Sequence, residues 1–470
     1  MEPTGSTNPE RPLIVVANRL PVRRVRKAGA AAWEISPGGL VTAMHPLLRE
    51  RGGSWVGWTG AEGGSSRAFE HEGINIHPVP LSRTEIERFY SGFSNETLWP
   101  LYHDVLRTPR FHRAWWRTYV DVNRKFADIL TPLVGRGETV WIHDYHLQLV
   151  PGMIRDRRPD ARIGFFLHIP FPAVELYGRM PWRRQILEGL LGADLIGFQD
   201  RLMAQNFLRA ARRYTPARGV GSVLQYSGRE IKALPFPISI DVKEFEDVAR
   251  SPAVVKKVDE LHNRIGRGRK ILLGVDRLDY TKGIDVRLRA YEEVLARGQH
   301  RTSDMCLIQI AVPSRGGAED YDEMRRTVEE TVGRINGEYA EPGRVAVHYL
   351  HRNLQREELV AYYRAADVML VTPLRDGMNL VAKEYVASRV DGFGVLVLSE
   401  FAGAANELRH AVQVNPFDID GMATAIEQAV AMPARDARQR MRSMRRTVHA
   451  YDLYTWASRF MDTLAGTGYA

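Results

Sequence analysis

Short apolar runs alternate with longer amphipathic stretches along nearly the whole chain. The runs have the length and composition of buried strands, as in SWVGW, KILLGVD, MCLIQIAV and GVLVLS. Between two of them, residues 283–298 place Ile284, Leu288, Tyr291, Val294 and Leu295 on one helical face, with Gly298 suited to end the helix. This alternation is typical of βαβ units. It predicts an α/β fold built on parallel sheets.

The chain has 470 residues, which is too long for one ordinary hydrophobic core and predicts two domains. The stretch ALPFPISID, residues 233–241, carries two prolines in an apolar context and suits a hinge. We therefore expect two Rossmann-like, doubly wound domains that face a central cleft. Their expected limits are 12–236 and 237–452, with a disordered tail at 1–11 and a helix within 453–470.

Composition and charge exclude several classes of protein. No apolar run approaches the roughly 18 residues that a membrane span needs. The only cysteine, Cys306, lies in an apolar run, which predicts a buried thiol, no intramolecular disulfide and a cytoplasmic protein. The net charge is +9, but the basic residues are scattered among acids, so anionic small molecules explain the surplus as well as nucleic acid does. We expect neither a nucleic-acid partner nor a membrane partner.

Polar side chains gather where the predicted strands end. In open parallel sheets, ligands bind beyond the carboxyl ends of the strands. The residues that follow expected strands in this way are Asn18, Arg19, Asp144, His168, Asp276, Arg277, Lys282, Arg315 and Asp376. We interpret their repetition as a ligand site, whereas a single cluster of this kind would indicate only a loop.

The segment GVDRLDYTKGI places two cations in one strand-to-helix turn. Arg277 and Lys282 are close enough in sequence to reach the same anion. The planar fork of arginine and the point charge of lysine together suit a diphosphate. The alternative is a solvated pair in which the cations bridge Asp276 or Asp279.

The segment PLRDGMNLVAKEY follows another expected strand. Pro373 and Gly377 suit a turn that presents Asp376, and Glu384 comes one helical turn after Leu380, within reach of a diol such as ribose. The backbone amides expected to begin the helix, and so to bind a phosphate, belong to Met378, Asn379, Leu380 and Val381. The alternative is a charged helix cap.

Two further signals are weaker. The glycines of SPGGL, including Gly39, precede a plausible helix and allow close approach to a ligand, although an ordinary turn explains them nearly as well. His168 fits either a core histidine or a donor to a sugar hydroxyl. The histidines of WIHDYHL do not have the spacing of a metal site, and we expect no metal.

Several blocks of the chain, taken together, resemble a known family. In order, they are NRLP, SPGGL, FYSGFSNETLWPLYH, WIHDYHL, FFLHIPFP, RLDYTKGI, PSRG, GRINGEY, PLRDGMNLVAKEY and FAGAANEL. They are similar to the signature blocks of trehalose-6-phosphate synthases, which are retaining glycosyltransferases of the GT-B architecture. The blocks run in family order from about residue 13 to 410.

The resemblance implies a role for each matching residue. Arg277 and Lys282 would clamp the donor diphosphate, the amides of residues 378–381 would cradle it, and Glu384 would bind the ribose. Asp376 and His168 would hold hydroxyls of the transferred glucose. The acceptor, glucose 6-phosphate, would be bound by Arg19, Tyr90, Trp99, Asp144, Arg315 and also Lys282. Gly39 would lie in a mobile glycine loop.

The resemblance also implies what the reaction needs. Glucose would pass from a nucleotide-glucose to glucose 6-phosphate, without a cofactor, a metal or a protein nucleophile. The product, α,α-trehalose 6-phosphate, would need a separate phosphatase to become trehalose. The resemblance further implies that the helix within 453–470 packs back on the N-terminal domain, and a homo-oligomer is compatible with it.

Three alternatives remain open at this point. Asn353, in YLHRNLQREEL, has a donor and an acceptor that fit a purine edge, so GDP-glucose stands beside UDP-glucose as donor, unless Asn353 is only a surface residue. A relative with another acceptor, such as glycerol 3-phosphate or a pseudo-sugar phosphate, is the second alternative. The third is a non-catalytic sugar-phosphate sensor, which is disfavoured because Arg277, Lys282, Asp376 and Glu384 are all present.

Overall fold

Two open sheets organise the chain. The computed structural model describes residues 13–27, 30–36, 39–104, 107–136, 138–313 and 319–466. The chain divides into two compact units. Unit 1 comprises the residues up to Pro237 together with those from Tyr454 on, and unit 2 runs from Ile238 to Leu453. The first division falls inside the proline-containing stretch that the sequence indicates as a hinge.

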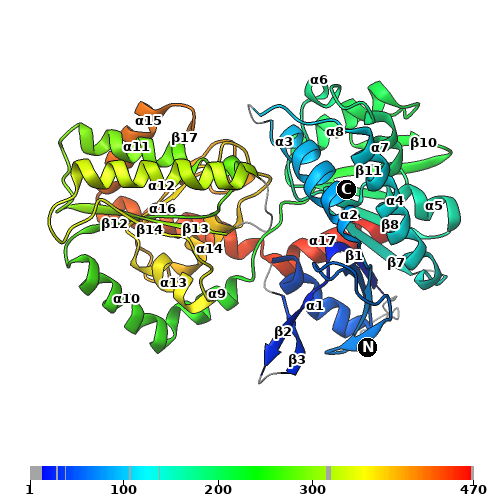
Figure 1. Ribbon diagram of the computed structural model, residues 1–470, viewed down its shortest axis with the longest axis horizontal. Coiled ribbons are helices and arrows are strands. Elements are labelled where there is room, and N and C mark those ends of the chain that lie inside the picture. Colours follow the sequence, from blue (N-terminus) through cyan, green and yellow to red (C-terminus); the bar gives the residue numbers. More distant parts are fainter. Residues whose placement is uncertain are drawn as a thin grey trace, which may run out of the picture. The chain divides into compact units, whose positions relative to one another are not determined.

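Unit 1 is built on a sheet of nine strands among the described residues, in the order β10-β11-β9-β8-β7-β1-β4-β6-β5. Its central strands are parallel, and the edge pairs β10–β11 and β5–β6 are antiparallel. The strands are β1 (Leu13–Arg19), β4 (Ser54–Trp58), β5 (Phe69–His71), β6 (Ile74–Pro78), β7 (Thr139–His143), β8 (Arg162–Phe166), β9 (Leu195–Phe198), β10 (Val223–Tyr226) and β11 (Arg229–Pro235). A separate antiparallel pair, β2 (Val22–Lys27) and β3 (Ala30–Ile35), extends away from this sheet (Figure 1).

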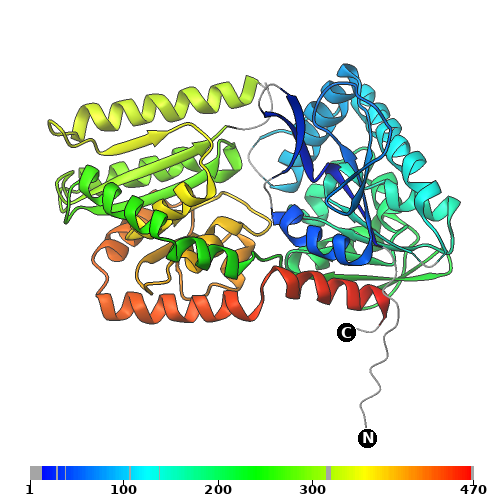
Figure 2. The ribbon, with the colours of Figure 1, turned by 90° about the horizontal axis from the view of Figure 1, so that it is seen from below.

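Helices connect the parallel strands of unit 1. They are α1 (Gly39–Arg51), α2 (Arg83–Glu85), the π-helix η1 (Ile86–Leu98), α3 (Trp99–Tyr102), α4 (Arg113–Leu130), η2 (Thr131–Leu133), η3 (Tyr145–Leu147), α5 (Val150–Arg157), α6 (Val174–Tyr177), α7 (Arg183–Leu190), α8 (Arg201–Tyr214) and α17 (Leu453–Ala465). Figure 2 shows α17, in red, running alongside the other elements of unit 1.

The last helix is tightly packed in unit 1. Trp456 of α17 is fully buried, with its ring 5.2 Å from that of Trp141, and its Nε1 donates to the carbonyl of Phe236 at 3.2 Å. Phe460 stacks on Trp141 at 4.3 Å. A side chain at Gly164 of β8 would come within 2.7 Å of the Phe460 ring, so the glycine makes room for it. Residues more than 200 positions apart therefore share one core.

In the described part of unit 2, six strands form a sheet in which every strand pairs in parallel, in the order β14-β13-β12-β15-β16-β17. The strands are β12 (Lys270–Arg277), β13 (Met305–Val312), β14 (Val347–Leu350), β15 (Val368–Val371), β16 (Val395–Ser399) and β17 (Val412–Val414). The reversal of strand order between β12 and β15 is the feature that creates a ligand crevice in doubly wound sheets.

Helices cover both faces of this second sheet. Figure 1 shows α11, α12 and α15 on one side of it and α9, α10 and α13 on the other. The helical elements of unit 2 are α9 (Val242–Arg250), α10 (Pro252–Ile265), η4 (Tyr280–Lys282), α11 (Ile284–Ala296), α12 (Glu319–Tyr339), α13 (Arg356–Ala365), α14 (Leu380–Ser388), η5 (Gly403–Asn406), α15 (Ile419–Val430) and α16 (Ala434–Ala450). No helix in the described part of the chain is long and apolar enough to cross a membrane.

Candidate active site

Arg19, the last residue of β1, lies on two aromatic rings of unit 1. Its guanidinium carbon is 4.0 Å from the ring centroid of Trp58 and 5.2 Å from that of Tyr90. Its carbonyl accepts a hydrogen bond from Trp55 Nε1 at 3.0 Å. A Cβ at Gly60, where φ is +91°, would overlap the Arg19 guanidinium. The sequence around β1 and β4 thus fixes one cation against aromatic faces.

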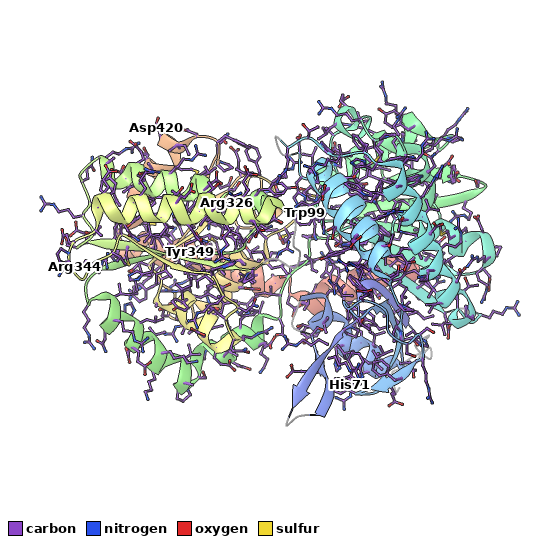
Figure 3. All side chains as sticks on the ribbon, in the orientation of Figure 1. His71, Trp99, Arg326, Arg344, Tyr349 and Asp420 are labelled. Carbon is purple, nitrogen blue, oxygen red and sulfur yellow. The ribbon has the colours of Figure 1, made fainter. Side chains whose placement is uncertain are left out.

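Tyr90 and Trp99 reach the same cluster through a π-helix. Tyr90 belongs to η1, and its ring stacks on His146 with an interplanar angle of 10° and a centroid separation of 5.8 Å. Trp99 lies where η1 passes into α3 (Figure 3), 5.7 Å from the ring of Tyr145. Burial and the positive charge of Arg19 lower the pKa of His146 to about 3, so its ring is neutral. Long π-helices are rare and often occur at functional sites.

Asp144 follows β7 in a backbone conformation that glycine normally occupies. Its φ is 77° and its ψ is 166°, a region that costs a residue with a side chain about 1–3 kcal/mol. Its Oδ1 accepts from the backbone N–H of His168 at 3.3 Å, and its Oδ2 is 4.0 Å from His146 Nδ1. Strain at this position is the kind of feature that functional sites retain.

His168 follows β8 by two residues and faces His143 at the end of β7. Its Nε2 is 3.2 Å from His143 Nδ1. Burial lowers the pKa of His168 to about 3, so it is uncharged at neutral pH. Four of the residues selected from the sequence therefore meet in unit 1 through direct contacts or one shared neighbour, namely Arg19, Tyr90, Asp144 and His168, and Trp99 reaches them through Tyr145 and His146.

In unit 2, the cations follow β12. Arg277 is the last residue of that strand and is exposed. Lys282 lies in η4, and its Nζ is 2.6 Å from Asp376 Oδ2, which also accepts from Asn379 Nδ2 at 3.0 Å. Lys282 therefore pairs with Asp376, and not with Asp276 or Asp279, the partners of the alternative interpretation.

The loop that carries Asp376 is held by its neighbours. The backbone N–H of Leu374 donates to Thr281 O at 2.8 Å, and that of Ala404 donates to Met378 O at 2.8 Å. Gly403 approaches the carbonyl of Gly377 so closely that a Cβ at residue 403 would overlap it. The loops after β12, β15 and β16 are thus joined into one surface.

Helix α14 begins at Leu380, slightly later than the sequence indicates. Asn379 caps it with φ at +70°, and its Oδ1 accepts from Ala382 N at 3.4 Å. The amides at the start of this helix lack the intrahelical acceptors that later residues have, which suits an anion. One turn on, Glu384 Oε2 accepts from Tyr363 OH at 2.8 Å, and burial raises the pKa of Glu384.

A buried arginine stands behind these loops. Arg287 of α11 is fully buried and donates from Nη1 to Asp276 Oδ2 at 2.5 Å and to Gln309 Oε1 at 3.0 Å. Its Nε donates to Thr372 Oγ1 at 3.0 Å, and its Nη2 to the carbonyl of Lys282 at 3.4 Å. One side chain thus ties the ends of β12, β13 and β15 to the loop that carries Lys282.

Comparison with known proteins identifies the family. Residues 11–466 match the sequence profile of glycosyltransferase family 20. The chain belongs to glycosyltransferase family 20. It is 54% identical over 465 residues to a trehalose-6-phosphate synthase of Mycolicibacterium smegmatis, covering 97% of this chain and 92% of that protein.

Solved structures of family members agree with this membership. The E. coli protein bound to UDP-2-fluoro glucose superposes with a TM-score of 0.89 at 36% identity, covering 96% of this chain and 98% of that one. A UDP-forming α,α-trehalose-phosphate synthase from Burkholderia xenovorans, in complex with glucose 6-phosphate, gives 0.88 at 36% identity, covering 97% and 100%. The predictions of an α/β fold of the GT-B type and of a glycosyltransferase are confirmed.

Three further residues are expected in the site of this glycosyltransferase. Gly39 begins α1. Asn353 is exposed in the loop between β14 and α13. Arg315 belongs to the segment 314–318, which is outside the described residues. Its assignment to the acceptor phosphate stays a prediction, and so do the assignments of Gly39 and Asn353.

Sequence reasoning missed the residues that support the site from behind. Arg287 and Tyr363 touch predicted site residues but were not selected, and His143 was considered only as a metal ligand. Arg287 had a detectable signal, because it is a charged residue inside the apolar face formed by Ile284, Leu288 and Tyr291. Among the described residues, no group of three or more histidine, cysteine or acidic side chains is arranged to hold a metal ion.

Proposed function

We propose that this family 20 glycosyltransferase moves glucose from a nucleotide-glucose to glucose 6-phosphate and releases α,α-trehalose 6-phosphate and a nucleoside diphosphate. The observation that carries the proposal is the pair of clusters at the carboxyl ends of strands, Lys282–Asp376–Asn379 in unit 2 and Arg19–Tyr90 in unit 1. The names of the relatives described above support both substrates.

Unit 2 binds the donor in this proposal. Arg277 and Lys282 contact the diphosphate, and the first amides of α14 hold it from the other side. Glu384, fixed by Tyr363, accepts from the ribose hydroxyls. Asp376, held between Lys282 and Asn379, accepts from a hydroxyl of the glucose that is transferred.

Unit 1 binds the acceptor. Arg19 donates to the phosphate of glucose 6-phosphate, because a guanidinium stacked on rings keeps its in-plane donors in a fixed orientation. Tyr90, Trp99 and, by family resemblance, Arg315 complete the acceptor site. The strained Asp144 aims its carboxylate at hydroxyls of the acceptor sugar, and His168 contacts the transferred glucose.

The transfer proceeds with retention at the anomeric carbon. The bond from that carbon to the diphosphate oxygen breaks, and a bond to the acceptor's anomeric hydroxyl oxygen forms on the same face. The diphosphate takes the proton that this hydroxyl loses. Arg277 and Lys282 stabilise the negative charge that develops on the diphosphate, and the remaining residues position the two sugars. The reaction as proposed needs no protein nucleophile, cofactor or metal.

The donor nucleotide has two candidates. UDP-glucose is supported by relatives that are UDP-forming or bind a UDP-sugar. GDP-glucose is supported by Asn353, whose exposed amide follows β14 and can pair with a purine edge. An acceptor other than glucose 6-phosphate, such as glycerol 3-phosphate, would require the Arg19 cluster to bind a smaller molecule.

One assay tests the proposal. The purified full chain is incubated with UDP-, GDP- and ADP-glucose, each with glucose 6-phosphate or glycerol 3-phosphate, and the products are identified by NMR. We expect α,α-trehalose 6-phosphate from at least one donor. A product with a β linkage, or transfer to glycerol 3-phosphate only, would contradict it. As expectations, the enzyme acts in the cytoplasm, beside a separate phosphatase, and a homo-oligomer is compatible with this role.

A further inference from the structure

Two histidines of unit 1 form a pair at the ends of neighbouring strands. Strands β7 and β8 are parallel and adjacent, and they bring His143 and His168 together with Nδ1 and Nε2 3.2 Å apart. The rings are nearly parallel, with an interplanar angle of 29°. A neutral imidazole has one N–H and one bare nitrogen, so a hydrogen bond between these atoms requires a proton on only one of them.

Both rings are neutral. His143 is fully buried, and burial together with the neighbouring imidazole lowers its pKa well below 6.5. Its ring lies 4.8 Å from that of Trp141, within the aromatic core under α17. His168 is only partly buried by its surroundings, but its pKa is lowered in the same direction. The pair therefore carries no net charge, and each ring has its single proton on either Nδ1 or Nε2.

The surroundings of His143 select one of the two tautomers. Its Nε2 is buried and has no hydrogen-bond partner among the described residues. A proton on Nε2 would leave a buried N–H without an acceptor, which is the rarer and costlier kind of unsatisfied group in proteins. A proton on Nδ1 leaves only a lone pair unsatisfied and places an N–H opposite His168. His143 is therefore the donor and His168 Nε2 the acceptor.

The backbone of His168 is held on both sides, which fixes the position from which its ring reaches His143. Its N–H donates to Asp144 Oδ1 at 3.3 Å, and its carbonyl accepts from Gln199 Nε2 at 3.3 Å. With Nε2 occupied as an acceptor, the proton of the neutral His168 ring must be on Nδ1.

We propose that His143 is a positioning residue that fixes His168 as its Nδ1–H tautomer, so that His168 offers an N–H donor to a substrate hydroxyl oxygen. The identity of that hydroxyl, on the transferred glucose, rests on the proposed function. The tautomer does not, because it follows from contacts within unit 1. His143 thus determines the tautomer of His168, although His143 itself is too buried to touch substrate.

Nitrogen NMR of the full chain tests the tautomer directly. In protein labelled with ¹⁵N-histidine, the protonated and bare ring nitrogens of a neutral imidazole resonate far apart. We expect His168 to show a protonated Nδ1 and a bare Nε2, with its signals assigned by their loss in His168→Asn. A protonated Nε2 on His168 in the wild-type chain would overturn the inference.

Variants of His143 separate positioning from packing. Asparagine at 143 keeps an amide N–H near the place of Nδ1, whereas leucine removes the donor and keeps the bulk. We expect His143→Leu to give a mixture of His168 tautomers and to lower kcat about fivefold, the worth of one ordinary hydrogen bond, with KM for glucose 6-phosphate little changed. His143→Asn should restore the tautomer and most of kcat. His112→Asn, an exposed histidine of the same unit, serves as the control.

The outcomes distinguish the two proposals. If the wild-type chain has the predicted tautomer but transfers glucose to no acceptor, the proposed function fails and the His143–His168 assignment stands. If transfer occurs but His143→Leu leaves both the tautomer and kcat unchanged, the positioning role fails and the function stands. If His143→Leu does not fold, the wild-type spectrum and the His143→Asn variant decide.

Discussion

The two units hold their cations in opposite ways. In unit 1, Arg19 lies on the rings of Trp58 and Tyr90, beside imidazoles that burial keeps neutral. In unit 2, Lys282 and Arg287 are each paired with a carboxylate, Asp376 and Asp276 respectively. An anion that reaches Lys282 must compete with Asp376, whereas the rings on which Arg19 lies carry no charge that competes for an anion. Around the candidate site, carboxylates therefore pair with the cations of unit 2, and aromatic rings support Arg19 of unit 1.

The largest loss of stability is expected when the buried Arg287–Asp276 ion pair of unit 2 is broken. Arg287→Met would leave Asp276 buried without its partner, and removing one member of a buried ion pair costs roughly 3–5 kcal/mol. Denaturant unfolding measures this loss. Arg289→Met is the matched control, because Arg289 lies on the same helix, is half exposed and has only a surface pair with Asp285, worth at most about 1 kcal/mol. Equal losses in the two variants would contradict this cost of breaking the buried pair.

Arg277→Ala separates catalysis from stability. Arg277 is exposed, so its removal should change the free energy of unfolding by no more than about 0.5 kcal/mol. If it stabilises the departing diphosphate, kcat should fall by roughly 10²–10³-fold. Turnover at saturating substrate, compared with Arg289→Ala, measures the effect. An unchanged turnover number would remove Arg277 from the proposed mechanism.

Backbone strain at Asp144 should make the glycine variant more stable than the alanine variant. Asp144→Gly and Asp144→Ala both lose the carboxylate that accepts from His168, but only glycine relaxes at φ 77°. We expect the glycine variant to be more stable than the alanine variant by about 1–3 kcal/mol, while both lose activity. Elsewhere in a chain, glycine is usually the less stable of the two. An alanine variant at least as stable as the glycine variant would show that the position is not strained.

Two histidines of unit 1 and Glu384 of unit 2 should contribute to the pH dependence of stability with opposite signs. His146 and His168 have pKa values lowered to about 3, so below pH 6.5 the unfolded chain binds more protons than the folded chain. Each then reduces the free energy of unfolding by about 1.4 kcal/mol per pH unit as pH falls from 6.5. Glu384 has a raised pKa, so its contribution falls as pH rises instead. Unfolding at pH 7, 6 and 5 checks this.

Matched variants assign those slopes to residues. His146→Gln should flatten the pH dependence between 7 and 5, because glutamine does not titrate. Glu384→Gln should remove the loss of stability that accompanies rising pH. A wild-type slope that neither variant changes would mean that other groups dominate.

Much of the fold was predictable because strands of parallel sheets are continuous apolar runs. MCLIQIAV and SWVGW coincide with β13 and β4, and Gly298, with φ at +73°, follows α11 as expected. The strands that were missed are short or polar: β9 is only LIGF, and β11 carries Arg229, Glu230 and Lys232 and lies next to the edge strand β10. RVAVHYL forms a strand only from Val347 on.

The sequence predicts those site residues that directly follow an apolar strand. Asp144, His168 and Arg277 were found because they follow apolar strands, and within each unit sheet topology brings such strand ends to one edge. The contacts between them were not predictable. His143 meets His168 across two strands, and Arg287 reaches the loop of Lys282 from within a helix. Those pairings depend on register and rotamer, which the linear pattern does not contain.

The central claim is that unit 2 binds the nucleotide and unit 1 binds the sugar phosphate. Calorimetric titration of UDP and GDP, and of glucose 6-phosphate in the presence of the nucleotide, into Arg277→Ala and Arg19→Ala tests it most directly. We predict that Arg277→Ala weakens nucleotide binding about ten- to hundredfold and leaves glucose 6-phosphate unaffected, and that Arg19→Ala does the reverse. If both variants weaken the same ligand and spare the other, the division of labour between the two units is wrong.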